Sequence, residues 1–411
     1  MGRPLEGIKV LELATFVAAP SCARLLADLG ADVIKVERPG GDDWRRTGIS
    51  YVPSRFSDQE NPVFDIYNTG KKLIALDLKK PEGMEAFHKL LAQADVFVTN
   101  VRPAGLKRLG LSYEDLKEKY PRLIYSIVVG YGEKGPDADK PAFDHTSFWA
   151  KSGFLRDLSP MNDLETYSPV NAPGGVGDTV SGMFLMGEIC AALINREKTG
   201  KGDYVVSSLY HNGIFVTGTM NIIGQRPFGA HYPHSRVDHG NPGGNYRCAD
   251  DEYVILCGIS DAKTLPGLYA MLGIPEMLTD PRFDTGAKRW ENREEYYGIL
   301  AAEFRKKTAN EWETIAQEYD LPIMRMNHFA DVAEDEQAWA NDYLEHVEFA
   351  NGRVDVMPRS PIEMGCMPEL KTVPAPLIGG HGREVLRDLG YTQEQMQQMI
   401  ASGVVTIQES K

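Results

Sequence analysis

The sequence is poor in cysteine and carries fewer basic than acidic residues. Its five cysteines are scattered and form no C-x-x-C pair, so neither a disulfide framework nor a zinc site is indicated, and free thiols suit a reducing cytoplasm. Lys and Arg number 44 against 58 Asp and Glu, a formal net charge of −14, which argues against a nucleic-acid partner. The cysteines are Cys22, Cys190, Cys248, Cys257 and Cys366.

Three further features are missing from the sequence. No apolar run approaches the roughly 18 residues of a membrane span, and no signal-peptide pattern precedes the first predicted strand. The turn after that strand, LATFVAAPSC, contains no glycine, so the G-x-G-x-x-G fingerprint of dinucleotide binding is absent. We therefore expect a cytoplasmic protein that has no membrane contact and does not bind NAD.

The first part of the chain alternates between two periodicities. Short apolar runs typical of buried strands are separated by segments with helical spacing, such as PEGMEAFHKLLAQ with proline at its start. Such alternation predicts an α/β fold with a doubly wound, Rossmann-like sheet. The predicted strands cover residues 7–13, 31–37, 73–78, 94–100 and 123–132.

Composition changes near residue 225, where GQRPFGAHYPHSRVDHGNPGGN is rich in glycine, proline and histidine. We interpret residues 201–225 as a linker and residues 226–330 as a smaller domain, which begins with the strand EYVILCG and continues through helices at 290–304 and 308–319. After about residue 330 the chain leaves this domain. It closes with one more helix, within residues 374–390.

Asp178 lies in NAPGGVGDTVSGMF, after three glycines and before a long helix that ends in NREKTGKGD. An aspartate at this point is typical of a helix N-cap, which is the structural interpretation. The functional interpretation is a nucleophile, since the positive helix end favours an ionised carboxylate and the glycines let a substrate approach.

Positive charge is concentrated locally despite the acidic total. NVRPAGLKR contains Arg102, Lys107 and Arg108 without an acid, KKLIALDLKK contains four lysines, and Arg38 follows the second predicted strand. Each charge alone is typical of a solvated surface, but three clusters at strand ends or in loops make a polyphosphate site plausible.

Three histidines of the glycine- and proline-rich segment, His231, His234 and His239, flank Asp238. Their spacing matches no helical pair and no zinc-finger pattern, so we expect loop residues and no metal.

Taken together, the ordered segments resemble the class III CoA-transferase family, which contains formyl-CoA transferase. The resemblance runs nearly from end to end. It implies that Asp178 is the catalytic nucleophile, that coenzyme A thioesters are substrates rather than permanent cofactors, and that an anhydride and an aspartyl-CoA thioester are intermediates. The segments include PLEGIKVLEL, LADLGADVIKVERPGGD, ADVFVTNVRPAGLKRLGL, PRLIYSIVVGYGEKGP, GDTVSGMFLMGEICAAL and PAPLIGGHGREVL.

The resemblance also implies an architecture and a set of CoA contacts. Residues 1–200 and 331–411 would form one large Rossmann-like domain from both chain ends, and two ring-shaped subunits would interlock as a homodimer. The implied CoA contacts are Val17, Ala18, Arg38, Leu76, Asp77, Leu78, Lys79, Asn100, Val101, Arg102, Arg108, Lys140 and Phe143.

Acyl-CoA racemases of the same superfamily are an alternative. They place a histidine directly before the aspartate that matches Asp144, whereas this chain has Phe143 there, and we expect His145 to point away from the site. One acid/base group of a racemase is then missing, which favours the transferase. A non-catalytic protein that binds CoA esters is a third alternative.

Within the family, YEDLKEKYPRLIYS, GYGEKGPDADKPAFD and EDEQAWANDYL resemble the subgroup of the cinnamoyl-CoA:phenyllactate and 2-hydroxyisocaproate CoA-transferases. This subgroup exchanges CoA between a 2-enoyl-CoA and an (R)-2-hydroxy acid in amino-acid fermentation. Gly243 and Gly244 are a short counterpart of the family's active-site lid. Candidates for an acyl pocket are Phe143, Phe148, Trp149, Met220 and Tyr232.

Overall fold

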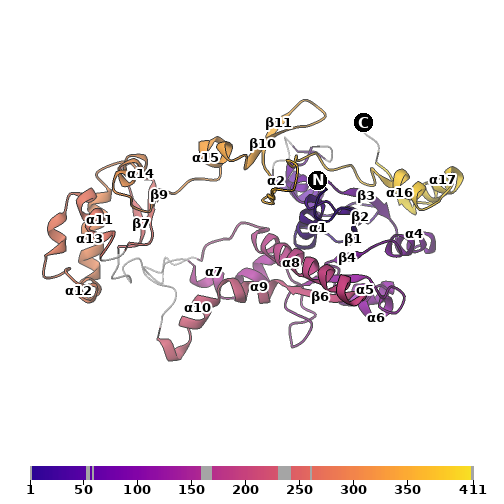
Figure 1. The fold of residues 1–411 in the computed structure, drawn as a ribbon, viewed down its shortest axis with the longest axis horizontal. Coiled ribbons are helices and arrows are strands. Elements are labelled where there is room, and N and C mark those ends of the chain that lie inside the picture. Colours follow the sequence, from indigo (N-terminus) through magenta and orange to yellow (C-terminus); the bar gives the residue numbers. More distant parts are fainter. Residues whose placement is uncertain are drawn as a thin grey trace. The chain divides into compact units, whose positions relative to one another are not determined.

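The computed structural model describes residues 2–51, 56–57, 60–158, 169–229, 242–259 and 262–408 (Figure 1). The chain forms two compact units. Unit 1 comprises Met1–Phe154, Asn171–Ile222 and Glu336–Lys411, and unit 2 comprises Leu155–Val170 and Ile223–Asp335. Unit 1 is therefore assembled from both ends of the chain.

A seven-stranded sheet forms the centre of unit 1, in the order β12-β3-β2-β1-β4-β5-β6. Neighbouring strands are parallel except for β12, which is antiparallel to β3, so the predicted α/β sheet is confirmed. The order reverses between β1 and β4, and sheets of this kind bind ligands beyond the carboxyl ends of the strands at that point. The strands are β1 (Lys9–Leu13), β2 (Asp32–Glu37), β3 (Lys72–Leu76), β4 (Val96–Thr99), β5 (Ile124–Val129), β6 (Asp203–Ser208) and β12 (Val405–Thr406).

The central strands are apolar on both faces because helices cover both sides of a parallel sheet. All six residues of β5, IYSIVV, are buried, and so are all four of β4. Phe97, Tyr125 and Ile127 lie in the same hydrophobic cluster as Phe87 from the helix α4, which begins at Pro81. The apolar runs in the sequence therefore correspond to buried strands.

The helices of unit 1 follow or connect these strands (Figure 1). They are α1 (Ala18–Asp28), α2 (Trp44–Tyr51), α3 (Pro62–Asp65), α4 (Pro81–Leu91), α5 (Pro103–Leu109), α6 (Tyr113–Leu116), a π-helix η1 (His145–Ala150), α8 (Val176–Thr199), α9 (Leu209–Val216), α15 (Glu336–Ala340), α16 (Gly382–Asp388) and α17 (Gln393–Ala401); α7 (Phe154–Asp157) and α10 (Gly218–Ile223) lie at boundaries between the units.

Helix α8 packs closely against α1 at Gly182. A Cβ atom on Gly182 would lie 2.0 Å from the Ser21 Oγ and 2.7 Å from the backbone oxygen of Ala18, so only glycine allows this approach. By length and composition alone α8 could cross a membrane, but 39% of its most apolar window is buried within the structure. We therefore describe α8 as a core helix.

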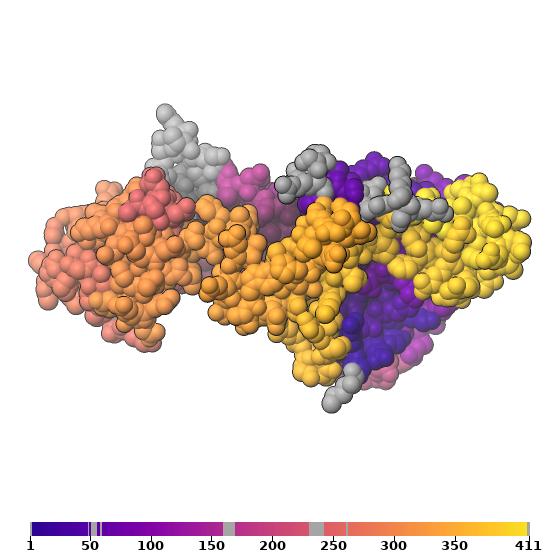
Figure 2. All heavy atoms as spheres, turned by 90° about the horizontal axis from the view of Figure 1, so that it is seen from above, coloured from indigo at the N-terminus to yellow at the C-terminus, as the bar shows by residue number. Residues whose placement is uncertain are grey.

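The C-terminal segment returns to the N-terminal half of the sheet. His381 pairs with Leu73, its backbone N–H donating to the Leu73 oxygen at 3.0 Å and its Nδ1 accepting from the Leu73 N–H at 3.2 Å. Both views show this yellow segment against the purple region of β3 and α4 (Figure 2). The prediction of a single closing helix is wrong, because α17 and the two-residue strand β12 follow α16. A hairpin of β10 (Leu344–Glu348) and β11 (Val354–Pro358) was also not predicted.

Part of the segment interpreted as a linker belongs to the sheet. Strand β6 pairs with β5 over six residues, and α9 follows it directly with Ser208 as its N-cap. The segment GDYVVSSLYHNGIF has a strand-like and then a helical pattern, which β6 and α9 confirm, but its interpretation as a linker did not include pairing with β5.

Unit 2 contains an antiparallel sheet in the order β7-β8-β9 and its own hydrophobic core. The core includes Tyr269, Tyr296, Leu300 and Phe304, all fully buried. The strand β7 precedes the first strand predicted for this domain. The elements are β7 (Gly244–Arg247), β8 (Tyr253–Leu256), β9 (Ile323–Arg325), α11 (Leu265–Leu272), α12 (Gly286–Glu291), α13 (Arg293–Phe304), α14 (Ala309–Glu318) and the 3₁₀ helices η2 (Arg226–Phe228), η3 (Pro275–Leu278) and η4 (Asp331–Glu334).

Candidate active site

Asp178 lies in the first turn of α8, at the edge of the sheet where the strands end. Because α8 connects β5 to the parallel strand β6, its N-terminus is at the carboxyl end of β5. The N-cap of α8 is Gly175, in the left-handed region with φ of 86°, and Asp178 is the third helical residue. The interpretation of Asp178 as a possible N-cap is therefore wrong, although its position in the positive end of the helix dipole is as expected.

A second carboxylate takes over the hydrogen bond that Asp178 could have formed. An acid at the third helical position often accepts from the N-cap backbone N–H, as part of a capping box. Here the Gly175 N–H donates instead to the Asp144 Oδ2 at 2.9 Å. Within the described part of the chain, no hydrogen bond engages the carboxylate of Asp178, so it is free to react.

Two glycines before Asp178 are required, Gly175 by its backbone conformation and Gly177 by close packing. A Cβ atom on Gly175 would lie 3.5 Å from the Tyr67 hydroxyl and 3.7 Å from the methyl groups of Val17, and its positive φ disfavours any side chain. A Cβ on Gly177 would lie 2.5 Å from the Phe148 ring. These contacts fix the start of α8, and with it the carboxylate of Asp178, against the loop after β1.

Burial raises the pKa of Asp178 to about 7 from its usual value of 3.8, and the negative charge of Asp144 adds to the rise. His145 has the opposite effect and lowers the pKa of Asp178. The helix N-terminus favours the anion, as expected, but partial burial outweighs it. With a pKa of about 7, the ionised carboxylate that the helix N-terminus favours is still present at neutral pH, together with the protonated acid.

His145 does not point away from this site, contrary to the prediction. Its Nδ1 lies 2.8 Å from the Asp144 Oδ1, and its Nε2 lies 2.9 Å from the backbone oxygen of Ala172. The ring thus bridges Asp144 and the segment that leads to Gly175. It is close enough to lower the pKa of Asp178.

Tyr67 completes the immediate surroundings of Asp178, and no sequence motif indicated it. Its hydroxyl lies 3.3 Å from the Thr179 Oγ1, which donates to the Gly175 oxygen at 2.8 Å. Burial raises the pKa of Tyr67, and the carboxylates of Asp178 and Asp144 add to the effect. The hydroxyl therefore stays protonated beside Asp178.

A cavity of about 430 Å³ opens at the carboxyl ends of β1, β2 and β3. Six of the residues predicted to contact CoA line it: Arg38, Leu76, Asp77, Leu78, Lys79 and Val101. The wall also contains residues that the sequence did not single out, namely Leu13, Ala14, Thr15, Val36, Glu37, Pro39, Asp42 and Leu109. The sheet topology gathers them, because all but Leu109, the last residue of α5, end a strand or lie in the segment after one at the same edge.

The other residues predicted to contact CoA do not line this cavity. Asn100 joins the ends of β4 and β1, accepting from the Thr15 N–H at 3.0 Å and donating to the Thr15 oxygen at 2.7 Å. Val17 and Ala18 are buried at the start of α1, and Arg102 and Arg108 are exposed on α5. Lys140 is exposed and forms an ion pair with Asp137. Phe143 is exposed and packs edge-to-face on Phe16.

Two of the acyl-pocket candidates are core residues. Phe148 and Trp149 are 2% and 7% exposed, and Phe148 packs under Gly177. Met220 is half-exposed on α10. Tyr232 and the histidines His231, His234 and His239 lie outside the described residues, whereas Gly244 begins β7 in unit 2.

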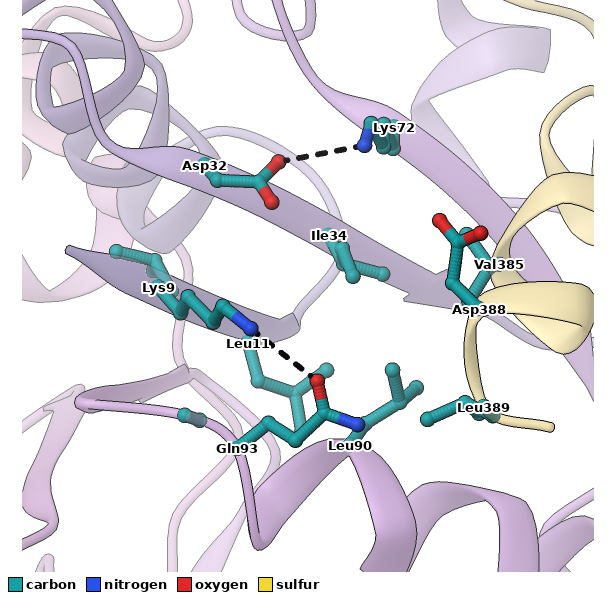
Figure 3. Close-up of a pocket in the computed structure, with 12 residues that line it drawn as sticks. Lys9, Leu11, Asp32, Ile34, Lys72, Leu90, Gln93, Val385, Asp388 and Leu389 are labelled. Atoms are coloured by element: carbon teal, nitrogen blue, oxygen red, sulfur yellow. Dashed lines mark hydrogen bonds and ion pairs between the residues drawn. The ribbon is translucent and has the colours of Figure 1, made fainter. Parts of the chain in front are cut away.

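A second cavity, of about 100 Å³, lies at the opposite end of the strands (Figure 3). Its polar wall residues pair with one another: the Lys9 Nζ donates to the Gln93 Oε1 at 3.2 Å, and Lys72 lies 3.7 Å from Asp32. Because these groups begin β1, β2 and β3, the cavity is separated from Asp178 by the length of the sheet.

The raised pKa of Asp178 predicts a pH-dependent cost to stability. The folded state holds this proton more tightly than the unfolded state between pH 3.8 and about 7, so stability falls as the pH rises through that window. Replacing Asp178 by Asn removes the cost, which reaches up to about 4 kcal/mol above pH 7. The Tm of Asp178→Asn should exceed that of the wild type, and by more at pH 8 than at pH 5.

Asp139→Asn is the matched control, because Asp139 is exposed. Its Tm should differ from that of the wild type by the same amount at both pH values. An Asp178→Asn advantage that is constant between pH 5 and pH 8 would contradict the raised pKa.

Comparison with known proteins agrees with this geometry. Residues 5–382 match the family described as CoA-transferase family III. The chain is 38% identical to (R)-2-hydroxy-4-methylpentanoate CoA-transferase from Clostridioides difficile, over 98% of this chain and 99% of the relative. It is 36% identical to cinnamoyl-CoA:phenyllactate CoA-transferase from Clostridium sporogenes, over 99% and 98%.

A solved structure shares the fold. The CAIB/BAIF family protein from Brucella suis superimposes with a TM-score of 0.81 at 28% identity, covering 95% of this chain and 100% of that protein. Sequence and structure therefore agree that this chain is an enzyme and belongs to CoA-transferase family III.

Proposed function

We propose that this enzyme moves CoA from an acyl-CoA, such as a 2-enoyl-CoA, to a carboxylic acid such as an (R)-2-hydroxy acid, and that Asp178 is the nucleophile. The observation that carries the proposal is the carboxylate of Asp178, partly buried and free of hydrogen bonds among the described residues, at a helix N-terminus on the ligand-binding edge of the sheet. Two relatives are named for 4-methyl-2-hydroxypentanoate and phenyllactate, both 2-hydroxy acids, which supports the choice of acid.

The donor half of the reaction begins with the ionised form of Asp178. One carboxylate oxygen attacks the acyl-CoA carbonyl, the C–S bond breaks, and a mixed anhydride and the CoA thiolate result. The thiolate then attacks the Asp178 carbonyl carbon, which forms the aspartyl-CoA thioester and releases the donor acid as a carboxylate. Both intermediates hydrolyse readily in water, so partial burial of Asp178 protects them.

The acceptor half repeats these steps in reverse order. The acceptor carboxylate attacks the aspartyl thioester and again forms an anhydride and the CoA thiolate. Attack of the thiolate on the acceptor carbonyl gives the new acyl-CoA and regenerates the Asp178 carboxylate. The backbone N–H groups of Val176 and Gly177, in the first turn of α8, have no acceptor within the helix and are available to stabilise the oxyanions.

The cavity at the ends of β1, β2 and β3 suits the nucleotide part of CoA. Its apolar wall of Leu76, Leu78 and Val101 can hold a flat adenine ring, and Arg38 and Lys79 at its border can neutralise phosphates. The cavity and Asp178 lie on the same edge of the sheet, so the pantetheine arm can extend from one to the other.

Substitution of Asp178 by Ala should abolish transfer, with a fall in kcat of about 10³-fold or more. Wild-type enzyme incubated with an acyl-CoA should carry CoA on the peptide that contains Asp178, detected by mass spectrometry, and Asp178→Ala should not. Asp139→Ala, which changes an exposed acid, should retain activity and adduct.

Two results would contradict the proposal. One is transfer at the wild-type rate by Asp178→Ala. The other is entry of solvent deuterium at the α-carbon of an acyl-CoA in the absence of any acceptor acid, which would indicate a racemase.

Removal of the positive charge at Arg38 should weaken the binding of CoA. We expect Arg38→Ala to raise the KM for the acyl-CoA about tenfold, the effect of one lost charge-assisted hydrogen bond, with a smaller change in kcat. Arg387→Ala, an exposed arginine on α16, is the control. An unchanged KM for Arg38→Ala would exclude a phosphate contact there.

We also propose that the enzyme is a homodimer, as the resemblance implies. Exposed apolar side chains on α8, α9 and α10 support this, because such patches usually mark interfaces. Light scattering should give twice the chain mass of 45.6 kDa, and Phe215→Glu should shift the mass toward the monomer while Phe329→Glu should not. A wild-type protein with the mass of a monomer would contradict the proposed homodimer. The exposed residues are Met183, Ile194, Phe215, Met220 and Ile222.

A further inference from the structure

We infer that four aromatic residues beside Asp178 form the subsite for the acyl side chain, and that this subsite accepts monocarboxylic acids with an aromatic or branched apolar side chain rather than dicarboxylic acids. The inference rests on the proposed function and names its substrate class. The four residues, called the aromatic arc below, are Phe16, Trp44, Tyr67 and Phe143.

The rings of the aromatic arc contact one another in series. Ring centroids are 6.3 Å apart for Tyr67 and Trp44, 6.3 Å for Trp44 and Phe16, and 5.4 Å for Phe16 and Phe143. All three pairs are edge-to-face, with interplanar angles between 60° and 84°. This geometry leaves ring faces that another apolar group can contact.

One end of the aromatic arc lies next to Asp178, and the other end belongs to the segment that holds the start of α8. At one end the Tyr67 hydroxyl is 3.3 Å from the Thr179 Oγ1, in the residue after Asp178. At the other end Phe143 directly precedes Asp144, whose carboxylate holds the N-cap of α8. The arc therefore borders the space in which a group attached to the Asp178 carboxylate must lie.

Polar contacts hold the backbone of two residues of the aromatic arc in place. One buried oxygen, the Asp42 Oδ1, accepts from the N–H groups of both Phe16 and Trp44 at 3.0 Å. The other oxygen of Asp42 pairs with Lys35 at 2.8 Å, and both side chains are buried. Phe16 has a φ of 62°, a left-handed backbone that is rare for a bulky residue and is fixed by this contact.

The degree of exposure separates the aromatic arc from the core aromatics. Phe148 and Trp149 are almost fully buried, whereas Phe16, Trp44 and Tyr67 are partly exposed and Phe143 is 56% exposed. Rings needed only for packing would bury more of their surface. Partly exposed rings that are rigidly held beside a reactive carboxylate are suited to contact an apolar ligand.

The charges at this site disfavour a second carboxylate on the substrate. Among the described residues, the charged groups that shift the pKa of Asp178 are Asp144 and His145. His145 already faces the Asp144 Oδ1 and the Ala172 oxygen. The second carboxylate of a dicarboxylic acid would lose water and meet the negative charge of Asp144.

An acceptor panel with a single acyl-CoA donor tests the inference. With 3-phenyllactate, 4-methyl-2-hydroxypentanoate, lactate and glutarate as acceptors, kcat/KM for the two apolar acids should exceed that for glutarate by about 100-fold or more. Phe143→Ala should lower the ratio of kcat/KM for 3-phenyllactate to that for lactate by about tenfold, because one aromatic contact is lost. Phe329→Ala, which removes a phenylalanine that is 90% exposed in unit 2, should leave this ratio unchanged.

The outcomes separate this inference from the proposed function. Glutarate as the preferred acceptor, or an equal loss for 3-phenyllactate and lactate in Phe143→Ala, would overturn the aromatic subsite alone, provided that the CoA adduct on Asp178 still forms. No transfer to any acid and no adduct would overturn the proposed function and the subsite with it.

Discussion

The hydrogen bond between the Gly175 N–H and Asp144 determines how the active site can work. It satisfies the N-cap of α8 from outside the helix, so the acid three residues later is not needed for capping. Glycine suits this position because its backbone is left-handed, with a φ of 86° that side chains disfavour. The same carboxylate of Asp144 binds His145 and raises the pKa of Asp178. One interaction therefore couples the start of the helix, the position of Asp178 and the protonation of its carboxylate.

Beneath this site, the loop after β1 is fixed by a group of buried charges. Glu12, fully buried in β1, accepts from Lys35 at 2.8 Å and from Lys71 at 2.7 Å. Burial lowers the pKa of Lys71 to about 8 against the pull of Glu12. For Lys35, Asp42 and Glu12 together outweigh burial and raise the pKa. The lysines in turn donate to backbone oxygens of the loop and of α1, so an ionic network holds the segment that carries Phe16.

Elements whose residue pattern repeats along the chain could be predicted from the sequence. Continuous apolar runs identified β1 to β5, and Pro81 marked the start of α4. The two-residue strand β12 was missed because it is too short to have a period and exists only through pairing with β3. From its position alone Asp178 was interpreted as a helix cap, whereas the ordered family segments imply that it is a nucleophile. The aromatic arc could not be predicted, since its residues come from separate segments and only the fold brings their rings together.

The burial that raises the pKa of Asp178 has a consequence for the proposed reaction. At neutral pH part of the enzyme holds the protonated acid, which lowers the concentration of the nucleophile. The ionised form, however, is unfavourable because it lacks water and faces Asp144. Formation of the anhydride or the thioester removes that charge, and with it the repulsion. The site therefore stabilises the acylated states of Asp178 relative to its free anion, while the same exclusion of water slows their hydrolysis. A fully solvated carboxylate would be a more abundant nucleophile, but it would lose both advantages.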